Sequence, residues 1–167
     1  MAIGVLATVV VGLAQAFVSA TQAVAAAGDT TTETILAEQK VQQLASLVWA
    51  FDATGQRVSD VSSNTAVWPD APGGGTGLAP SPADALDHDT PGYVDYLDRF
   101  GRPVAAESAA YTRRWAIAPG PLAPEDTLVV QVVTARSERL ARMGPLSLER
   151  RIAGVVRLVR VRTRLLQ

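Results

Sequence analysis

Cysteine is absent from this chain of 167 residues, which excludes disulfide bonds, thiol nucleophiles and cysteine-ligated metal sites. Histidine occurs once, at His88 in the polar stretch DALDHDTPG, so a histidine-based metal site or a Ser-His-Asp triad would need this residue. The stretch has the composition of a turn, which favours a solvated loop histidine over a catalytic one. We therefore expect no enzymatic activity and assign no catalytic, cofactor-binding or metal-binding residue.

Charge of either sign is missing from the first 28 residues, and the first ionised side chain is Asp29. A secretory signal peptide needs a basic n-region, but no lysine or arginine precedes Lys40. A membrane span needs about 20 predominantly apolar residues, and residues 2–27 are long enough for one. Four polar residues dilute the second half of this segment: Gln15, Ser19, Thr21 and Gln22. Its polarity thus rises gradually, whereas an ordinary span ends abruptly at charged or aromatic flanks.

The remaining charge is divided between the two halves of the chain. Up to Asp98 there are 11 acidic side chains and two basic ones, a net charge of −9, whereas from Arg99 onward 13 arginines and five acidic side chains give +8. A basic strand face is expected from four arginines near the C-terminus: Arg157, Arg160, Arg162 and Arg164. Such a face suits the phosphates of DNA, but mutual neutralisation of the halves, within one fold or between neighbouring subunits, is the simpler interpretation.

A second helical pattern follows the uncharged segment. Apolar residues recur at spacings of four and three: Ala37, Val41, Leu44, Val48 and Phe51. Polar residues lie off this seam: Glu33, Glu38, Lys40, Gln42 and Gln43. The helix either restarts after Gly28, with Thr30 and Glu33 as a capping box, or continues through Gly28 with a bend. A continuous helix from Ala2 to about Phe51 would be roughly 75 Å long, so one half must project from a globule of this size and find partners elsewhere.

The rest of the chain predicts a loop followed by strands. Residues 53–82 are rich in glycine and proline and form either a flexible linker or a packed excursion pinned by Trp68. Strands are predicted in four stretches: 92–98, 111–119, 127–135 and 155–166. Trp115 and Ile117 are expected to be buried, and a bulge is expected near Arg157.

We therefore predict an α+β protein. Residues 1–28 form the hydrophobic half of a long N-terminal helix, residues 29–52 form its amphipathic half, and residues 53–167 form a globular head. The C-terminal half of the helix packs on an antiparallel sheet of three to five strands.

The order of these segments resembles that of type IV pilins and type II secretion pseudopilins, and the details resemble the minor pilins. AIGVLATVVVGLAQAFVSATQA is similar to the inner part of the pilin N-terminal helix, and LAEQKVQQLASL to the region where that helix enters the head. GYVDYLDRFGRPV, AYTRRWAIAP and TLVVQVVTARS, in this order, resemble the strands of a minor-pilin head. The resemblance covers nearly the whole chain except the Gly/Pro-rich loop.

This resemblance implies a structural subunit rather than an enzyme. The helix would be anchored in the inner membrane with the head outside the cytoplasm, and would then enter a periplasmic or cell-surface filament. Its partners would be lipid and the helices of other subunits, with no cofactor or small-molecule substrate. The family's leader peptide and assembly glutamate have no counterpart before Ala2, so we expect the leader and the first turns of the helix to be missing from this chain. The alternative is a membrane-anchored or exported extracytoplasmic binding domain that does not polymerise, with residues 1–27 as anchor or signal.

One acidic pattern needs a separate interpretation. Counted from Asp87, five residues match positions 1, 3, 6, 9 and 12 of a calcium-binding loop: Asp87, Asp89, Gly92, Asp95 and Asp98. Pro91 takes a ligand position of that pattern, and an aspartate replaces its final glutamate. Solvated turn acids are the favoured interpretation, and calcium binding at the four aspartates is the alternative.

Overall fold

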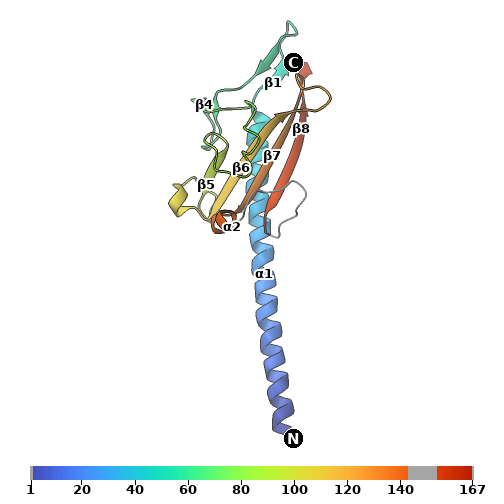
Figure 1. Cartoon of the computed structure of the whole chain (residues 1–167), viewed down its shortest axis with the longest axis vertical. Helices are drawn as coiled ribbons and strands as arrows, with labels where there is room; N and C mark the ends of the chain where they lie inside the picture. Colours follow the sequence, from blue (N-terminus) through green and yellow to red (C-terminus); the bar gives the residue numbers. More distant parts are fainter. Residues whose placement is uncertain (1, 143–153, 167) are drawn as a thin grey trace.

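A computed structural model describes residues 2–142 and 154–166 of the chain. Its longest element is helix α1, which runs without interruption from Ala2 to Ser46 over 45 residues (Figure 1). Gly28 lies inside this helix, and the hydroxyl of Thr30 donates to the carbonyl of Ala26 instead of capping a new helix. Of the two alternatives that the sequence left open, the continuous helix is the one that forms.

The end of α1 lies closer to the N-terminus than the apolar spacing predicted. The helix stops at Ser46, Phe51 belongs to strand β1 (Trp49–Phe51), and Val48 is exposed, so the predicted continuation to about Phe51 was wrong. The last turn of α1 carries no basic residue of its own. A distant arginine supplies the cation that stabilises a helix C-terminus, as described below.

The main sheet contains four antiparallel strands in the order β5–β6–β7–β8. Their bounds agree with the four predicted stretches: β5 Val94–Leu97, β6 Tyr111–Pro119, β7 Thr127–Arg136 and β8 Val156–Thr163. Residue pairing places Trp115 opposite Val132 and Ile117 opposite Val130, so these side chains share one face of the sheet. All four are buried in one cluster with α1, which confirms the burial predicted for Trp115 and Ile117.

Strand β8 pairs with β7 from Thr127 opposite Thr163 to Thr134 opposite Val156 without a shift of register. The bulge predicted near Arg157 was therefore wrong. The break in the strand comes at Arg164, after which β9 (Leu165–Leu166) leaves the main sheet and pairs in parallel with β1.

The Gly/Pro-rich segment 53–82 holds more regular structure than its composition suggested. Strand β2 (Arg57–Ser59) pairs with β1, and β3 (Ser63–Asn64) pairs with β4 (Ala71–Gly74). Leu78 is buried in the main core, whereas Trp68 is 67% exposed. The segment is therefore packed against the head, and the side chain that anchors it in the core is Leu78 rather than Trp68.

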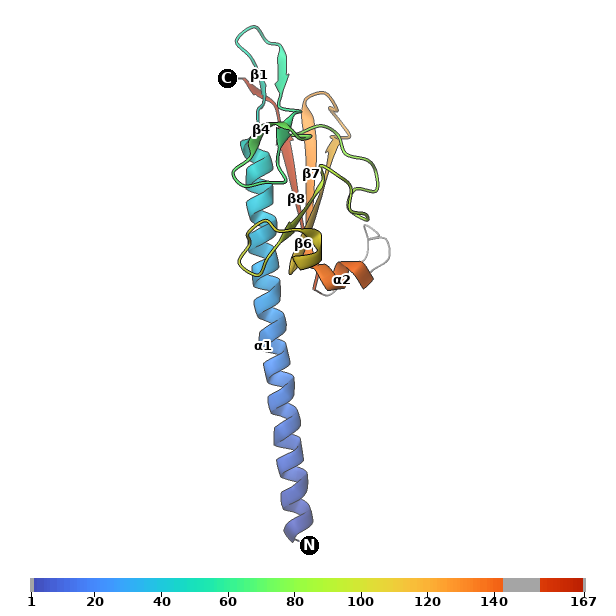
Figure 2. The ribbon, with the colours of Figure 1, turned by 90° about the vertical axis from the view of Figure 1, so that its left-hand side faces the viewer.

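The upper half of α1 and the main sheet form two layers, with α1 on one face of the sheet (Figure 2). Two short elements lie at the end of the head nearest the projecting helix: the 3-10 helix η1 (Ala106–Ser108) and helix α2 (Ser137–Arg142). The protein is thus α+β, with a long N-terminal helix packed through its C-terminal half on a four-stranded antiparallel sheet, as the sequence predicted.

Candidate functional site

The most unusual surface of the molecule is the stem, which we define as residues 12–28 of α1. Every residue of the stem is exposed, including Leu13 at 66%, Phe17 at 72% and Val24 at 73%. The stem projects away from the sheet (Figure 2), and no described residue of the head buries these side chains. Large contiguous apolar surfaces are rare on monomeric proteins and mark contacts with other proteins or with lipid.

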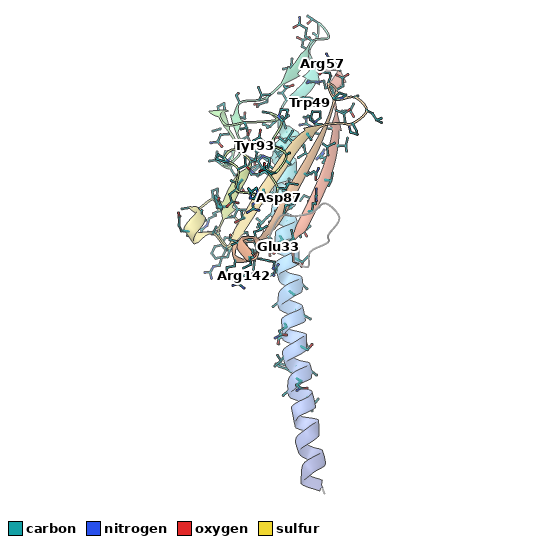
Figure 3. All side chains as sticks on the ribbon, viewed as in Figure 1. Glu33, Trp49, Arg57, Asp87, Tyr93 and Arg142 are labelled. Atoms are coloured by element: carbon teal, nitrogen blue, oxygen red, sulfur yellow. The ribbon has the colours of Figure 1, made fainter. Side chains whose placement is uncertain are left out.

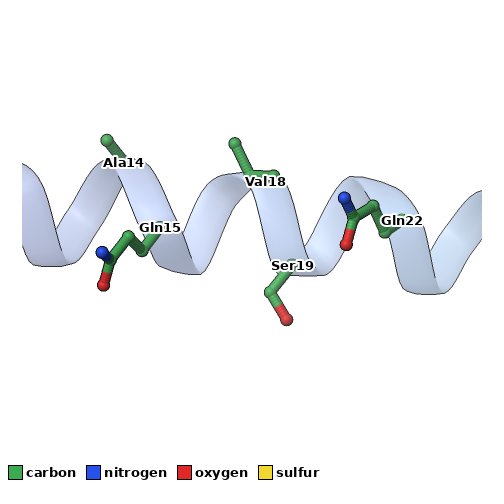
Figure 4. A pocket seen from close by; sticks show the side chains of 5 residues that line it. All are labelled: Ala14, Gln15, Val18, Ser19 and Gln22. Carbon is green, nitrogen blue, oxygen red and sulfur yellow. The ribbon is translucent and has the colours of Figure 1, made fainter.

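Hydrogen-bonding groups on the stem fall into two classes. The hydroxyl of Thr21 donates to the carbonyls of Phe17 and Val18, and is therefore satisfied within the helix. Gln15, Ser19 and Gln22 have no side-chain partner among the described residues. Figure 4 shows these three on the same side of the helix, along a shallow groove that Ala14 and Val18 also line.

Among the helices that the structure describes, none has the length and apolar character needed to span a membrane.

The part of α1 inside the head is held by a buried charge cluster around Lys40, the sole lysine of the chain. The Nζ atom of Lys40 lies 2.7 Å from Oδ2 of Asp95 on β5. It also donates to Oε1 of Gln43 at 2.8 Å and to the carbonyl of Thr65. The ammonium sits 4.2 Å from the ring centroid of Trp115, which adds a cation–π contact.

Asp95 also joins α1 to strand β6. Its two carboxylate oxygens accept hydrogen bonds from Nε and Nη2 of Arg113 at 2.8 and 2.7 Å, and Nη1 of Arg113 donates to the carbonyl of Leu36 at 2.9 Å. Two buried cations thus share one carboxylate. Burial lowers the pKa of Lys40 to about 8, an effect that the attraction of Asp95 offsets only in part.

Two acidic residues bind arginines where α1 leaves the head, at the position of Glu33 in Figure 3. Asp29 makes a bidentate pair with Arg136, at 2.8 and 2.6 Å, and these hydrogen bonds hold the pKa of Asp29 below its ordinary value. Glu33 is fully buried, and its Oε1 lies 3.3 Å from Nη1 of Arg139 on α2. Its Oε2 has no hydrogen-bond partner in the described part of the chain. Burial raises the pKa of Glu33, against the pull of Arg139.

The four arginines of the predicted basic face do not share one face. Arg160 and Arg162 lie on the side of β8 that meets α1, whereas Arg157 lies on the opposite side and donates to Oε1 of Gln131 on β7. Arg162 donates to the carbonyls of Leu44 and Leu47 at 2.9 and 3.0 Å, and so caps the C-terminal end of α1. Arg164 stacks 3.4 Å from the ring centroid of Trp49 and is itself buried. Arg160 is exposed, and among the residues that the structure describes its side chain bonds only Gln42, at 3.4 Å. The opposite face of β8 carries Arg157 together with the exposed Val159 and Val161, so the strand does not present a row of arginines to solvent.

The two oppositely charged halves of the chain bind each other within the fold. Arginines after position 98 pair with acids up to that position in several places: Arg102–Asp98, Arg113–Asp95, Arg114–Asp89, Arg136–Asp29 and Arg139–Glu33. For these residues the simpler interpretation of the charge division is confirmed.

The aspartates of the candidate calcium loop are separated by their own contacts. Asp95 faces inward to Lys40 and Arg113, as described above, whereas Asp98 accepts hydrogen bonds from the backbone N–H groups of Phe100 and Arg102. Asp98 therefore closes a tight turn instead of pointing toward Asp95.

The other two aspartates lie near Arg114. Oδ1 of Asp89 accepts from Nε of Arg114 at 2.8 Å, and the carbonyl of Asp87 accepts from its Nη1 at 2.7 Å. His88 is exposed in the same loop. Across residues 2–142 and 154–166, no three acidic or histidine side chains are grouped so as to hold a metal ion.

The sequence interpretation missed the buried role of Lys40. It placed Glu33 and Lys40 off the apolar seam, yet both are fully buried on the face of α1 that meets the sheet. A signal was present, because Glu33, Ala37, Lys40 and Leu44 follow the same spacing of four, three and four as the apolar residues. Their partner Asp95 lies far away in the sequence, and nothing local identifies it.

Comparisons with models of protein families, with curated proteins and with solved structures find no match for this chain.

Proposed function

We propose that this chain is a structural subunit, a minor pilin or pseudopilin, of a type IV pilus or a type II secretion filament. The observation that carries the proposal is the exposed apolar stem, which continues directly into a helix built into the head. A helix that projects with its leucine, phenylalanine and valine side chains uncovered needs an apolar partner outside its own chain. The segment order that resembles minor pilins supports the same function.

The physical logic is a transfer between two apolar surroundings. Before assembly the uncharged segment lies in the inner membrane, with the head outside the cytoplasm, and after assembly the helices of neighbouring subunits replace the lipid. The exchange exposes little apolar surface to water, so it costs little free energy. Helix-satisfied hydroxyls such as that of Thr21 suit both surroundings, because no hydrogen bond has to be broken in either one.

The buried cluster around Lys40 supports this role for a different reason. A subunit held in a filament by its stem must transmit force to its head without the two separating. Charge-assisted hydrogen bonds from Lys40 and Arg113 to Asp95 tie α1 to two strands of the sheet. DNA binding is not part of the proposal, because three of the four arginines make contacts within the fold: Arg157 with Gln131 on β7, Arg162 with the end of α1 and Arg164 with β1.

The decisive experiment places a charge on the stem of the full chain in the cells that produce it. Phe17→Asp should cost about 3 kcal/mol in an apolar environment, and should deplete the protein from filaments sheared from those cells. The matched control is Leu122→Asp, which adds the same charge at a fully exposed leucine of the head. Thermal unfolding of both variants checks that the head remains folded.

Depletion of the Phe17 variant with normal recovery of the control supports assembly through the stem. Equal recovery of both variants with the filaments would overturn the proposal. Absence of the unsubstituted chain from sheared filaments would also overturn it, and would favour the non-polymerising extracytoplasmic binding domain, in which the stem is a passive tether.

A further inference from the structure

Strand β8 (Val156–Thr163) is the longest open sheet edge in the described part of the fold. It forms one side of the main sheet and, among the described residues, pairs only with β7 (Figure 1). The other strands at the edges of their sheets are two to four residues long: β2, β3, β4, β5 and β9. β8 is therefore the described strand with the most backbone free to pair with another chain.

Few of the features that usually protect an edge strand are found in β8. Bulges, prolines and covering loops prevent an edge from pairing with other chains. β8 keeps its register with β7 throughout and contains no proline, and Val159, Arg160 and Val161 are exposed in its middle. The protection that remains is charge, because the strand carries three arginines and no acidic residue. A chain that pairs with this edge has to match that charge.

The arginines of β8 lack the acidic partners that most other arginines of the head have. Arg157, Arg160 and Arg162 have no carboxylate within ion-pair distance among the described residues, whereas ion pairs occupy arginines elsewhere in the head. Their hydrogen-bond partners are neutral oxygens of four residues: Gln131, Gln42, Leu44 and Leu47. Burial and the nearby charge of Arg160 both lower the pKa of Arg162, so the two guanidinium groups repel each other. Within the described fold, the positive charge of β8 is thus not compensated.

The two faces of β8 differ in chemistry near its exposed middle. Arg160 lies opposite the buried Val130, on the face of the sheet that α1 covers. Val159 and Val161 lie on the other face, where they are 59% and 62% exposed. Valine side chains on a pleated surface are stabilised by β-branched or aromatic side chains on the neighbouring strand. The edge therefore suits a strand in which acidic and apolar residues alternate.

We propose that the β8 edge binds an extended acidic segment of another protein, which adds to the main sheet as a further strand. Backbone hydrogen bonds to β8 hold the segment, and side chains on its two faces give specificity. Carboxylates of the segment face Arg160 and Arg162, and its β-branched side chains face Val159 and Val161. This interaction goes beyond the proposed function and does not depend on the stem.

A second copy of this chain does not offer such a segment at its own sheet edges. Two β8 strands side by side would bring two sets of arginines together, and like charges facing each other across a strand pair are destabilising. The opposite edge of the sheet, β5, has only four residues, and the N–H of Val104 already donates to the carbonyl of Tyr96 there. The acidic residue of β5 is Asp95, which is buried with Lys40 and Arg113. We therefore assign the β8 edge to a different protein.

A designed peptide tests the inference on the full chain in micelles of a non-ionic detergent. The probe is a short acetylated peptide in which glutamate and valine alternate, and fluorescence anisotropy measures its affinity. Arg160→Glu should weaken binding at least about tenfold, because it replaces an attraction by a repulsion. The matched control is Arg99→Glu, which makes the same change at an exposed arginine outside β8 and should leave the affinity unchanged. Thermal unfolding checks that both variants are folded.

Methylation of the peptide backbone separates strand addition from a purely electrostatic contact. Alternate residues of an extended chain direct their N–H groups toward opposite edges, so methylation of all glutamate nitrogens or of all valine nitrogens removes the donors of one edge only. One of the two methylated peptides should bind at least about tenfold more weakly than the parent, because its hydrogen bonds to β8 are lost. The other should bind like the parent peptide.

Each outcome decides the inference. Unequal binding of the two methylated peptides, together with weaker binding to Arg160→Glu than to Arg99→Glu, supports it. Equal affinities of the methylated peptides, equal affinities of the two variants, or no binding of the parent peptide at millimolar concentration would overturn it. Loss of peptide binding as the concentration of the chain is raised would overturn it as well, because a second copy would then occupy the edge. The proposed function is judged separately by Phe17→Asp, which alters the stem and leaves β8 unchanged.

Discussion

Asp95 is the residue on which the attachment of α1 to the sheet depends most. It is the one carboxylate within contact of both Lys40 and Arg113 among the described residues, and all three side chains are buried. Breaking a buried ion pair from one side leaves an uncompensated charge, which costs more than replacing the whole pair. Loss of either cation therefore leaves one ion pair in place, whereas loss of the Asp95 carboxylate leaves no ion pair in the cluster.

Substitution of Asp95 should therefore lower the free energy of unfolding more than substitution of Lys40. We expect Asp95→Asn to lower the free energy of unfolding by about 3–5 kcal/mol, because both cations lose their partner. Lys40→Met should cost clearly less, because Arg113 keeps its two hydrogen bonds to Asp95. Urea unfolding of the two variants measures the difference, and an equal or larger loss for Lys40→Met would contradict this account.

Glu33 predicts a dependence of stability on pH. Burial raises its pKa in the folded protein above the ordinary value of 4.5, so the folded state binds the proton at pH values where the unfolded chain has released it. The stability contributed by Glu33 is therefore fully present below about pH 4.5 and declines as pH rises through the raised pKa. Asp29 has the opposite tendency, because its pKa is lowered.

A Glu33→Gln variant isolates this contribution. It keeps the size of the side chain and removes the titration, while Asp29 remains the same in both proteins. The difference in free energy of unfolding between wild type and variant should fall as pH rises from 4.5 to 7.5, as measured by urea titrations across that range. A constant or rising difference would show that Arg139 outweighs burial at this site.

At the scale of single elements, the end of α1 depends on a residue more than a hundred positions away. Arg162 donates to the carbonyls of Leu44 and Leu47, which have no partner inside the helix. Arg162→Met should lower stability by about 1–2 kcal/mol through the loss of these hydrogen bonds. Arg160→Met is the matched control on the same face of β8, and it should change the melting temperature little because Arg160 is exposed. Similar losses for both would contradict a specific capping role.

The element boundaries show what the sequence could and could not predict. The alternation of Trp115 and Ile117 with small or polar neighbours identified β6, because burial on one face of a sheet leaves a period of two. The end of α1 was missed because Val48 and Phe51 continue the apolar spacing, and only tertiary contacts with β2 and β9 draw Phe51 into a strand. The location of the buried charges depends on pairings between distant residues, which no local pattern encodes.

Substitutions in the Gly/Pro-rich segment test whether Leu78 or Trp68 anchors it to the head. Leu78→Ala should lower stability by about 2–5 kcal/mol, because it removes a fully buried side chain from the core. Trp68→Ala removes a larger side chain that is mostly exposed, and should cost less than about 1 kcal/mol. Thermal unfolding compares the two variants. A larger loss for Trp68→Ala would instead support the alternative, left open by the sequence, in which the tryptophan anchors this segment.

At the scale of the whole molecule, the protein consists of a head that carries its own core and a stem that adds nothing to that core. The buried clusters draw on α1 from Leu36 onward, and the lowest ion pair between α1 and the rest of the head is that of Asp29 with Arg136. Residues of α1 from Asp29 onward thus contribute to the folded head, whereas the stem is left free for the proposed assembly. A change in the stem can alter association without altering the fold, which is the property that the filament experiment relies on.

This division predicts that the head is stable without the stem. A chain that begins at Val24 keeps one turn of helix ahead of Asp29 and therefore every contact between α1 and the sheet. Its melting temperature should lie within about 2 °C of that of the full chain, because exposed side chains contribute little to stability. The shortened chain should also fail to bind phosphatidylcholine vesicles in a flotation assay that retains the full chain. A large drop in melting temperature would show that the stem folds back onto the head in solution, and unchanged vesicle binding would assign membrane association to the head instead of the stem.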